Sequence, residues 1–160
     1  MGQPKTNPLN GSALTYYIFE GVLIGRSGGT TFHLLALSGG GGGSTAKPQD
    51  FGGGFYPYLT GKKTTGTGVS HVHGGPIPPG RYIIHPPSQN PHLGLSAFLE
   101  PYGNGQMMDR SGFYIHGRGP HGSDGCIVPL ENFKPLMDAI AKDGGGTLFV
   151  QEAMGGARFA

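Results

Sequence analysis

Residues 113–130 read FYIHGRGPHGSDGCIVPL, and no other stretch of the chain says as much about its structure and chemistry. The stretch begins with an alternating apolar run that ends at His116 and predicts a β-strand. Several glycines in the loop that follows let the chain turn back sharply, which would bring the imidazole of His116 to the thiol of Cys126. A cysteine is a strong nucleophile only as the thiolate, and a neighbouring histidine is the commonest base. The stretch therefore predicts a catalytic cysteine–histidine pair at the end of a strand.

Both residues also have purely structural explanations. A single cysteine such as Cys126 is often a small buried core residue, and His116 is compatible with a core histidine at a strand end. The flanking glycines and the upstream histidine together favour the catalytic interpretation over the structural one.

Two motifs resemble those of the YkuD-type L,D-transpeptidases. Ile115-His116-Gly117 resembles the strand end Ile-His-Gly of that family. Residues 123–127, SDGCI, resemble its Ser/Thr-His-Gly-Cys motif followed by an apolar residue, with Asp124 where the family has a histidine. Residues 75–82, GPIPPGRY, are similar to a segment of a divergent branch, the peptidoglycan-targeting effectors of bacterial type VI secretion systems. The resemblance covers about residues 75–151, and two spaced motifs in the expected order are fairly specific.

The resemblance implies an L,D-transpeptidase-like catalytic β-sheet or sandwich and a cysteine enzyme that needs no cofactor and no metal. Its substrate would be the tetrapeptide stem of peptidoglycan, attacked by Cys126 with His116 as the base, to form a thioester acyl-enzyme. Water would then give L,D-carboxypeptidase activity. A D-amino acid as acceptor would give exchange, and a second stem would give a cross-link.

The other site predictions lie close to this pair. The backbone N–H groups of Gly125 and Cys126 are suited to hold an oxyanion, because glycine leaves the main chain accessible to the substrate. We expect turn support from Ser123, Asp124 and Gly117, and substrate contacts from Arg118, His121 and Tyr114. Simpler roles remain open for these last three: a solvated loop charge, an exposed loop histidine and an ordinary strand residue.

Composition indicates one domain of many turns and short strands. The chain has 160 residues, with 33 glycines, 14 prolines, no tryptophan and 12% charged residues. We expect a single domain over residues 1–160, with a catalytic core at about 75–151. Residues 1–74 would supply N-terminal strands and glycine-rich loops, and are a candidate lid over the active site.

Hydrophobic periodicity predicts a mainly β fold with one short helix after the catalytic turn. Apolar residues recur at helical spacing from about 131 to 142, and a glycine run ends the pattern. The expected strands are 14–20, 22–25, 30–37, 81–85, 93–99, 112–116 and 147–151. Residues 38–54 contain a run of five glycines and are expected to form a loop.

Charge and targeting signals restrict the partners. A net charge of +2 gives no dense basic stripe for nucleic acid, and no apolar stretch approaches the length needed to cross a membrane. The first residues lack the pattern of a secretory signal, so we expect the chain to be made in the cytoplasm. The effector resemblance then implies a type VI secretion delivery component, action in the target-cell periplasm, and a cognate immunity protein.

Two other functions compete with the cysteine enzyme. His71 and His73 lie on one face of an extended segment and, with other histidines and Cys126, offer ligands for a zinc-dependent peptidoglycan amidase or peptidase. Their spacing matches no zinc signature, and paired histidines in a polar loop are usually exposed. Glycine-rich strands with exposed aromatic residues would also suit a non-catalytic cell-wall-binding module.

Overall fold

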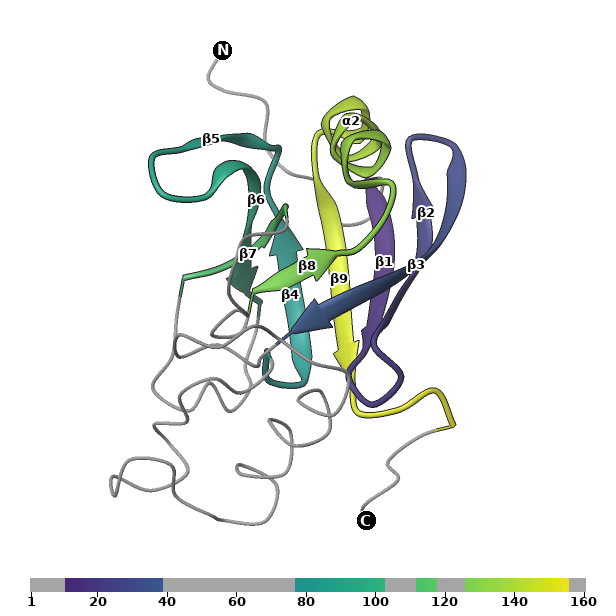
Figure 1. The fold of residues 1–160 in the computed structure, drawn as a ribbon. Coiled ribbons are helices and arrows are strands. Elements are labelled where there is room, and N and C mark those ends of the chain that lie inside the picture. Colours follow the sequence, from purple (N-terminus) through teal and green to yellow (C-terminus); the bar gives the residue numbers. More distant parts are fainter. Residues whose placement is uncertain (1–10, 39–76, 103–111, 118–125, 156–160) are drawn as a thin grey trace, which may run out of the picture.

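The protein is described from a computed structural model that covers residues 11–38, 77–102, 112–117 and 126–155. Figure 1 labels the elements in chain order. They are β1 (Ser12–Tyr17), β2 (Val22–Ser27), β3 (Thr30–Ser38), β4 (Gly80–Ile84), β5 (Ser88–Asn90), β6 (Gly94–Pro101), β7 (Phe113–His116), β8 (Ile127–Pro129), α2 (Phe133–Asp143) and β9 (Gly146–Gln151).

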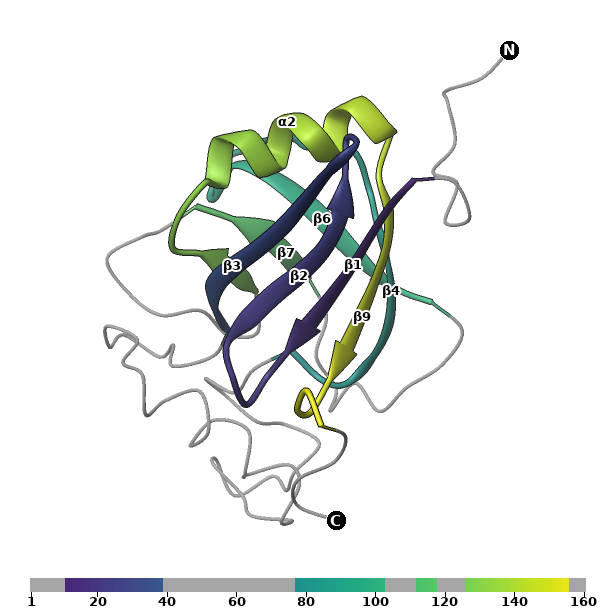
Figure 2. The same cartoon turned by 90° about the vertical axis from the view of Figure 1, so that its right-hand side faces the viewer.

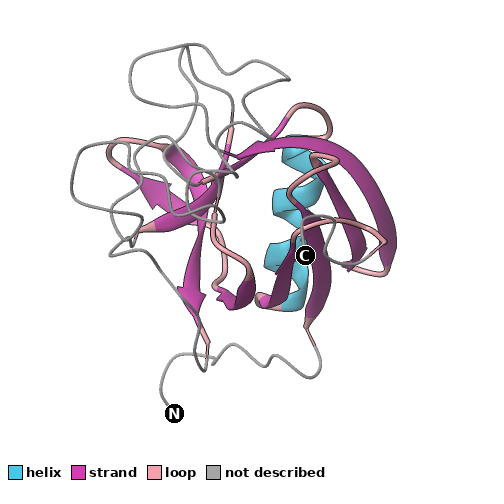
Figure 3. Ribbon diagram, turned by 90° about the horizontal axis from the view of Figure 1, so that it is seen from below, coloured by secondary structure: helices cyan, strands magenta, loops and turns pink. Residues whose placement is uncertain are grey.

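The strands form one sheet that closes on itself. Their order is β4-β9-β1-β2-β3-β8-β7-β6-β5, and β4 also pairs with β6. The closing pair is antiparallel, with Ile84 opposite Leu99. Seen from below, the strands surround an interior, and α2 lies at its far end (Figure 3). Because closure pairs strands that would otherwise be edges, the sheet exposes little unpaired backbone.

Alternation along the strands separates an inner from an outer face. In β7, Phe113 and Ile115 are buried in the core, whereas Tyr114 and His116 are half-buried on the other face. The same rule places Ala97 and Leu99 of β6 inside. The inner face therefore builds the core, and Tyr114 and His116 of β7 lie on the outer face.

Helix α2 covers one end of the sheet (Figure 2). Its buried residues Leu136, Met137 and Ile140 form the apolar stripe that the sequence predicts. The helix begins at Phe133 after Asn132, which has a left-handed φ of 52°, and ends at Gly144, with φ 73°. A left-handed glycine after the last turn is a common helix end, because no Cβ opposes that conformation.

A polar network fastens the end of α2 to the β2–β3 hairpin. The Asp143 carboxylate accepts hydrogen bonds from Ser12 Oγ at 2.9 Å and from the backbone N–H of Gly28 at 2.7 Å. Ser12 Oγ also lies 2.7 Å from Ser27 Oγ. Gly28, at φ 59°, passes so close to Ala139 that an added Cβ would lie 2.8 Å from its Cα. The hairpin and the helix are thereby held in one relative position.

The predicted fold class, mainly β with one short helix after the cysteine turn, is confirmed. The expected strands and helix are present with shifts of a few residues at their ends, as is usual at element boundaries. Strands β5 and β8 were not predicted, because three residues are too few to show a periodicity.

The N-terminal strands belong to the same closed sheet as the site. β1 pairs with β9 and β3 pairs with β8, so residues 12–38 help to complete the sheet. Residues 39–76, which contain the glycine run and most of the predicted lid, lie outside the described residues. Within the described ranges, no helix is long and apolar enough to cross a bilayer.

Candidate active site

The predicted nucleophile and base come from two neighbouring strands. β7 and β8 pair in parallel, with Ile115 opposite Ile127. Both isoleucines are buried in the core; His116 directly follows the first, and Cys126 directly precedes the second. For regular strands, the rise and spacing would put the Cα atoms of His116 and Cys126 roughly 8 Å apart, on a diagonal of the pair. The structure therefore brings the two sequence-predicted residues to neighbouring segments of the sheet.

The imidazole of His116 is held in one tautomer. Its Nδ1 lies 2.8 Å from the carbonyl oxygen of Gly117, and because a carbonyl can only accept, Nδ1 carries the proton. Nε2 is then the basic nitrogen of the neutral ring. Burial lowers the pKa of His116, and the hydrogen bond to Gly117 opposes this only in part. A neutral imidazole at neutral pH is the form that can take a proton from a thiol.

Gly117 is itself fixed by the beginning of α2. A Cβ added at Gly117 would lie 3.5 Å from the ring of Phe133, so this ring packs directly over the glycine. Phe133 follows Asn132, whose left-handed backbone sets the direction in which the helix begins. Strained residues of this kind persist where the surrounding structure holds them, often beside functional sites. Gly117 thus supports the site through its carbonyl as well as through the turn.

The thiol of Cys126 is half-buried directly before β8. Its Sγ donates to the carbonyl oxygen of Gly112 at 3.8 Å. This bond is long and weak. Catalytic hydrogen bonds are often loose before substrate binds and tighten in the complex.

Tyr114 lies in a row of rings beside the predicted nucleophile. The register places it opposite the backbone of Cys126, and its ring packs on Phe98 with centroids 5.2 Å apart. Phe98 stacks in turn on His85 at 5.5 Å, and His85 Nε2 is 2.8 Å from Glu100 Oε1. Tyr114 is therefore placed to line the site, and its role as a substrate contact remains a prediction.

Sequence reasoning missed one residue on this face. Ser96 of β6 is directly opposite His116 of β7, and directly opposed residues of an antiparallel pair share a face. Ser96 is only 1% exposed, and its Oγ has no hydrogen-bond partner among the residues that the structure describes. The alternation of this serine with Leu95, Ala97 and Leu99 indicates in the sequence which face of the strand it occupies. The sequence does not indicate which strand pairs with β6, so it could not reveal that His116 is opposite Ser96.

The remaining site predictions cannot be placed. Gly125, Ser123, Asp124, Arg118 and His121 lie outside the described residues, and so do His71 and His73 of the zinc alternative. Over the part of the chain that is described, no group of three or more His, Cys, Asp or Glu side chains gathers in a way that could hold a metal.

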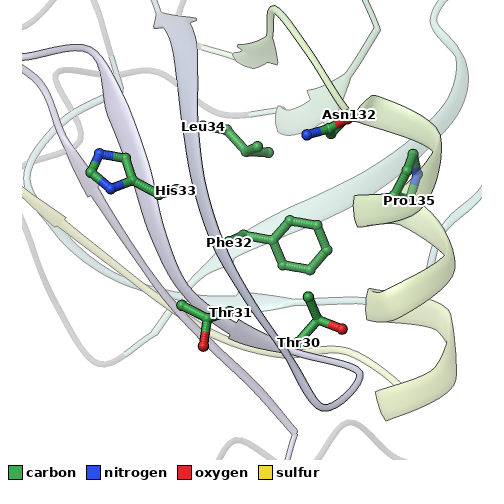
Figure 4. A pocket seen from close by; sticks show the side chains of 7 residues that line it. All are labelled: Thr30, Thr31, Phe32, His33, Leu34, Asn132 and Pro135. Atoms are coloured by element: carbon green, nitrogen blue, oxygen red, sulfur yellow. The ribbon is translucent and has the colours of Figure 1, made fainter.

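A hollow of about 450 Å³ opens between β3 and the beginning of α2 (Figure 4). Phe32 and Leu34 point toward the helix, whereas His33 points to the other side of β3 (Figure 4). The lining also includes Thr30, Thr31, Asn132 and Pro135. It contains neither the nucleophile nor the base, so this hollow is not the candidate active site.

Comparison by sequence finds little: no protein-family model matches the chain, and no curated protein matches it significantly. Comparison of structures finds L,D-transpeptidases and related proteins, the superfamily that the two motifs indicate. The helical cell shape determining protein Pgp2 of Campylobacter jejuni matches with a TM-score of 0.50 and 14% identity, over 90% of this chain and 48% of that one.

Two further matches are L,D-transpeptidases by name. That of Xylanimonas cellulosilytica has a TM-score of 0.49 and 13% identity, over 88% of this chain and 60% of that one. That of Mycobacterium smegmatis has a TM-score of 0.45 and 14% identity, over 88% of this chain and 58% of that one. At such identities a match concerns the fold alone, and the chain spans 60% or less of the length of each of these structures.

Proposed function

We propose that this protein is a cysteine-dependent peptidoglycan-modifying enzyme that acts as an L,D-carboxypeptidase, an L,D-transpeptidase or both on tetrapeptide stems. One observation carries the proposal. The parallel pairing of β7 with β8 makes the segments of His116 and Cys126 neighbours, and the hydrogen bond of His116 Nδ1 to Gly117 leaves Nε2 as the basic nitrogen that a general base needs. The two motifs of the sequence support the choice of substrate.

The first half of the reaction follows from this geometry. His116 Nε2 takes the proton of the Cys126 thiol, and the thiolate attacks the peptide carbonyl before the terminal D-alanine. Backbone N–H groups at Gly125 and Cys126 would hold the negative oxygen of the tetrahedral intermediate. The carbon–nitrogen bond then breaks, His116 returns its proton to the leaving amine, and a thioester remains on Cys126.

The second half resolves the thioester. His116 takes a proton from the attacking water or amine, the carbon–sulfur bond breaks, and the thiolate recovers the proton from the imidazolium. Water as acceptor shortens the stem to a tripeptide. A free D-amino acid restores a tetrapeptide with a new end, and the amine of another stem gives a cross-link.

The effector role is a further part of the proposal and rests on the sequence motifs. The protein would be made in the cytoplasm, delivered by a type VI secretion component to the periplasm of a target cell, and neutralised in the producer by an immunity protein. Co-purification with the product of the adjacent reading frame would test the immunity partner. Failure to bind any neighbouring product would count against the effector role and leave the enzymatic proposal intact.

The enzymatic proposal is tested by mass spectrometry of muropeptides. Diaminopimelate-type sacculi would be incubated with wild-type, Cys126→Ala and His116→Ala proteins, with and without D-amino acids and with and without a chelator. We expect tripeptides or exchanged tetrapeptides only when both residues are intact, whatever the chelator does. Activity that survives Cys126→Ala and is lost with chelator would instead favour the zinc enzyme, and unchanged tetrapeptides throughout would reject this substrate.

A further inference from the structure

The hydroxyl of Ser96 is the one buried side-chain oxygen or nitrogen in the described part of the chain that has no hydrogen-bond partner. Burying a hydroxyl without a partner destabilises a fold, so such groups are uncommon in native structures and need an explanation. Alanine occupies the next position of the same strand without any such cost. The position of Ser96 in the sheet supplies the explanation.

Ser96 lies beside the proposed base. The β6–β7 register pairs it with His116, and the contact of Phe98 with Tyr114, one pair further along, shows that side chains of this face meet across the two strands. Directly opposed residues have Cβ atoms about 4.5–5.5 Å apart, so the hydroxyl is within reach of the imidazole after a small side-chain rotation. His116 thus has Ser96 directly opposite it on β6, while Cys126, just before β8, lies diagonally from it on the other side.

The charge of His116 changes during the proposed reaction, and the surroundings of the ring must respond. In the neutral ring, Nδ1 donates to Gly117 and Nε2 accepts the thiol proton. Once Nε2 is protonated, the ring is a cation in a partly buried site, where a positive charge is poorly solvated. A hydroxyl can rotate to present its oxygen to such a cation, and this adds to the hydrogen bond between Nδ1 and Gly117, which strengthens when the ring is charged.

We infer that Ser96 is a positioning residue of the active site, whose hydroxyl turns its oxygen toward the imidazolium of His116 and stabilises it while the thiol proton resides there. The proton moves only between Cys126 Sγ and His116 Nε2, and Ser96 transfers none. This inference rests on the proposed function, because it needs His116 to act as the base for Cys126.

Among the described residues on this face, the groups that can titrate are Cys126, Tyr114 and the pair of His85 and Glu100 beyond Phe98. On the row of His116, β6 and β5 contribute Ser96 and Ser88, which do not ionise in the relevant range. Cys126 precedes β8, and α2 faces Gly117 with the uncharged ring of Phe133. Ser96→Ala and a Ser88→Ala control leave all of these groups in place, so a difference between the two variants in the titration of His116 is assigned to the hydroxyl of Ser96.

The first measurement is the NMR titration of the His116 ring in a Cys126→Ala background, which removes the coupled thiol. We expect Ser96→Ala to lower the pKa of His116 further and Ser96→Thr, which keeps the hydroxyl, to restore it. Ser88→Ala is the matched control, since Ser88 is the exposed serine opposite Ser96 on β5. An identical titration in Ser96→Ala and its parent would overturn the inference.

The second measurement is the rate of Cys126 alkylation by iodoacetamide near pH 7, with the melting temperature of each variant. Ser96→Ala should slow alkylation about tenfold, the effect of one hydrogen bond to a charged group, while its melting temperature stays equal or rises. A fall in melting temperature with unchanged alkylation would make Ser96 merely structural. If His116→Gln also leaves alkylation unchanged, the proposed base itself fails, and this outcome is distinct from a failure of Ser96 alone.

Discussion

Two sets of buried serines in the same closed sheet have opposite surroundings. Ser12 and Ser27, at the end of the sheet near α2, bond to each other, and Ser12 also donates to Asp143. Ser96, beside His116, is equally buried and has no partner among the described residues. A satisfied polar network rigidifies a fold, whereas an unsatisfied group is tolerated where a reaction uses it. The difference separates the part of the sheet with a satisfied polar network from the part in which we propose that the reaction takes place.

This comparison of the two regions predicts that the substitution with the largest effect on activity has little effect on stability. Cys126→Ala should reduce turnover of muropeptides by at least about 10⁴-fold, because no thioester can form. Its melting temperature should stay within a few degrees of the wild type, since the half-buried thiol is small and its bond to Gly112 is long. Calorimetry beside the mass-spectrometric assay measures both, and a large loss of stability would mean that this cysteine is a core residue.

His116→Gln should reduce turnover by about 10²–10⁴-fold, the range for loss of a general base. In the wild type, burial holds the pKa of His116 below its ordinary value of 6.5, so the acid limb of the kcat/KM profile should lie below pH 6.5. The same shift affects folding. As the pH falls through 6.5, the unfolded chain binds this proton before the folded protein does, so the free energy of unfolding of the wild type should decrease. Below the pKa of His116 in the folded protein, both states carry the proton, and this group should cause no further change in stability.

Denaturant unfolding at pH 7.5 and at pH 5.5 checks the sign of this dependence. His116→Gln should lose less stability than the wild type between the two pH values, because glutamine does not titrate. An equal loss in both proteins would show that His116 titrates normally in the folded state, against the burial seen in the structure.

At the stabilising end of the sheet, Asp143→Ala should cost about 2 kcal/mol, because Ser12 and the N–H of Gly28 would both lose a charged acceptor. Asp138→Ala is the matched control on the same helix, since Asp138 forms an exposed ion pair with Lys134 that contributes about 0–1 kcal/mol. Urea denaturation gives both values. Alkylation of Cys126 should be unchanged in both variants, and a slowed reaction in Asp143→Ala would break the separation of the two regions.

The smallest effects come from a pair of adjacent glycines. Gly28 and Gly29 both have a left-handed backbone, but only an added Cβ at Gly28 would meet the backbone of Ala139. Gly29→Ala should cost about 1 kcal/mol from its backbone conformation alone, and Gly28→Ala should cost more. The difference between the melting temperatures of the two variants measures the cost of disturbing the close packing of the β2–β3 hairpin on α2. Equal values would mean that α2 moves aside without cost.

Local pattern was sufficient for much of this protein. The alternation of 113–116, the helical stripe of α2 and the turn residues fixed the strands and the helix to within a few residues. The two motifs identified His116 and Cys126, because a thiol and an imidazole in a glycine-rich turn suggest a specific chemistry. Periodicity also determines which side chains of a strand share a face, as it does for Tyr114 and His116.

Only the tertiary structure decided which strands lie side by side. The closing of the sheet by β4 and β6, the parallel pairing of β7 with the short β8, and the position of Ser96 opposite His116 all depend on contacts between distant segments. Alternation fixes a face within one strand, but register and strand order are set by closure of the whole sheet around its core. For that reason the sequence predicted a nucleophile and a base, while the serine opposite His116 emerged only from the folded molecule.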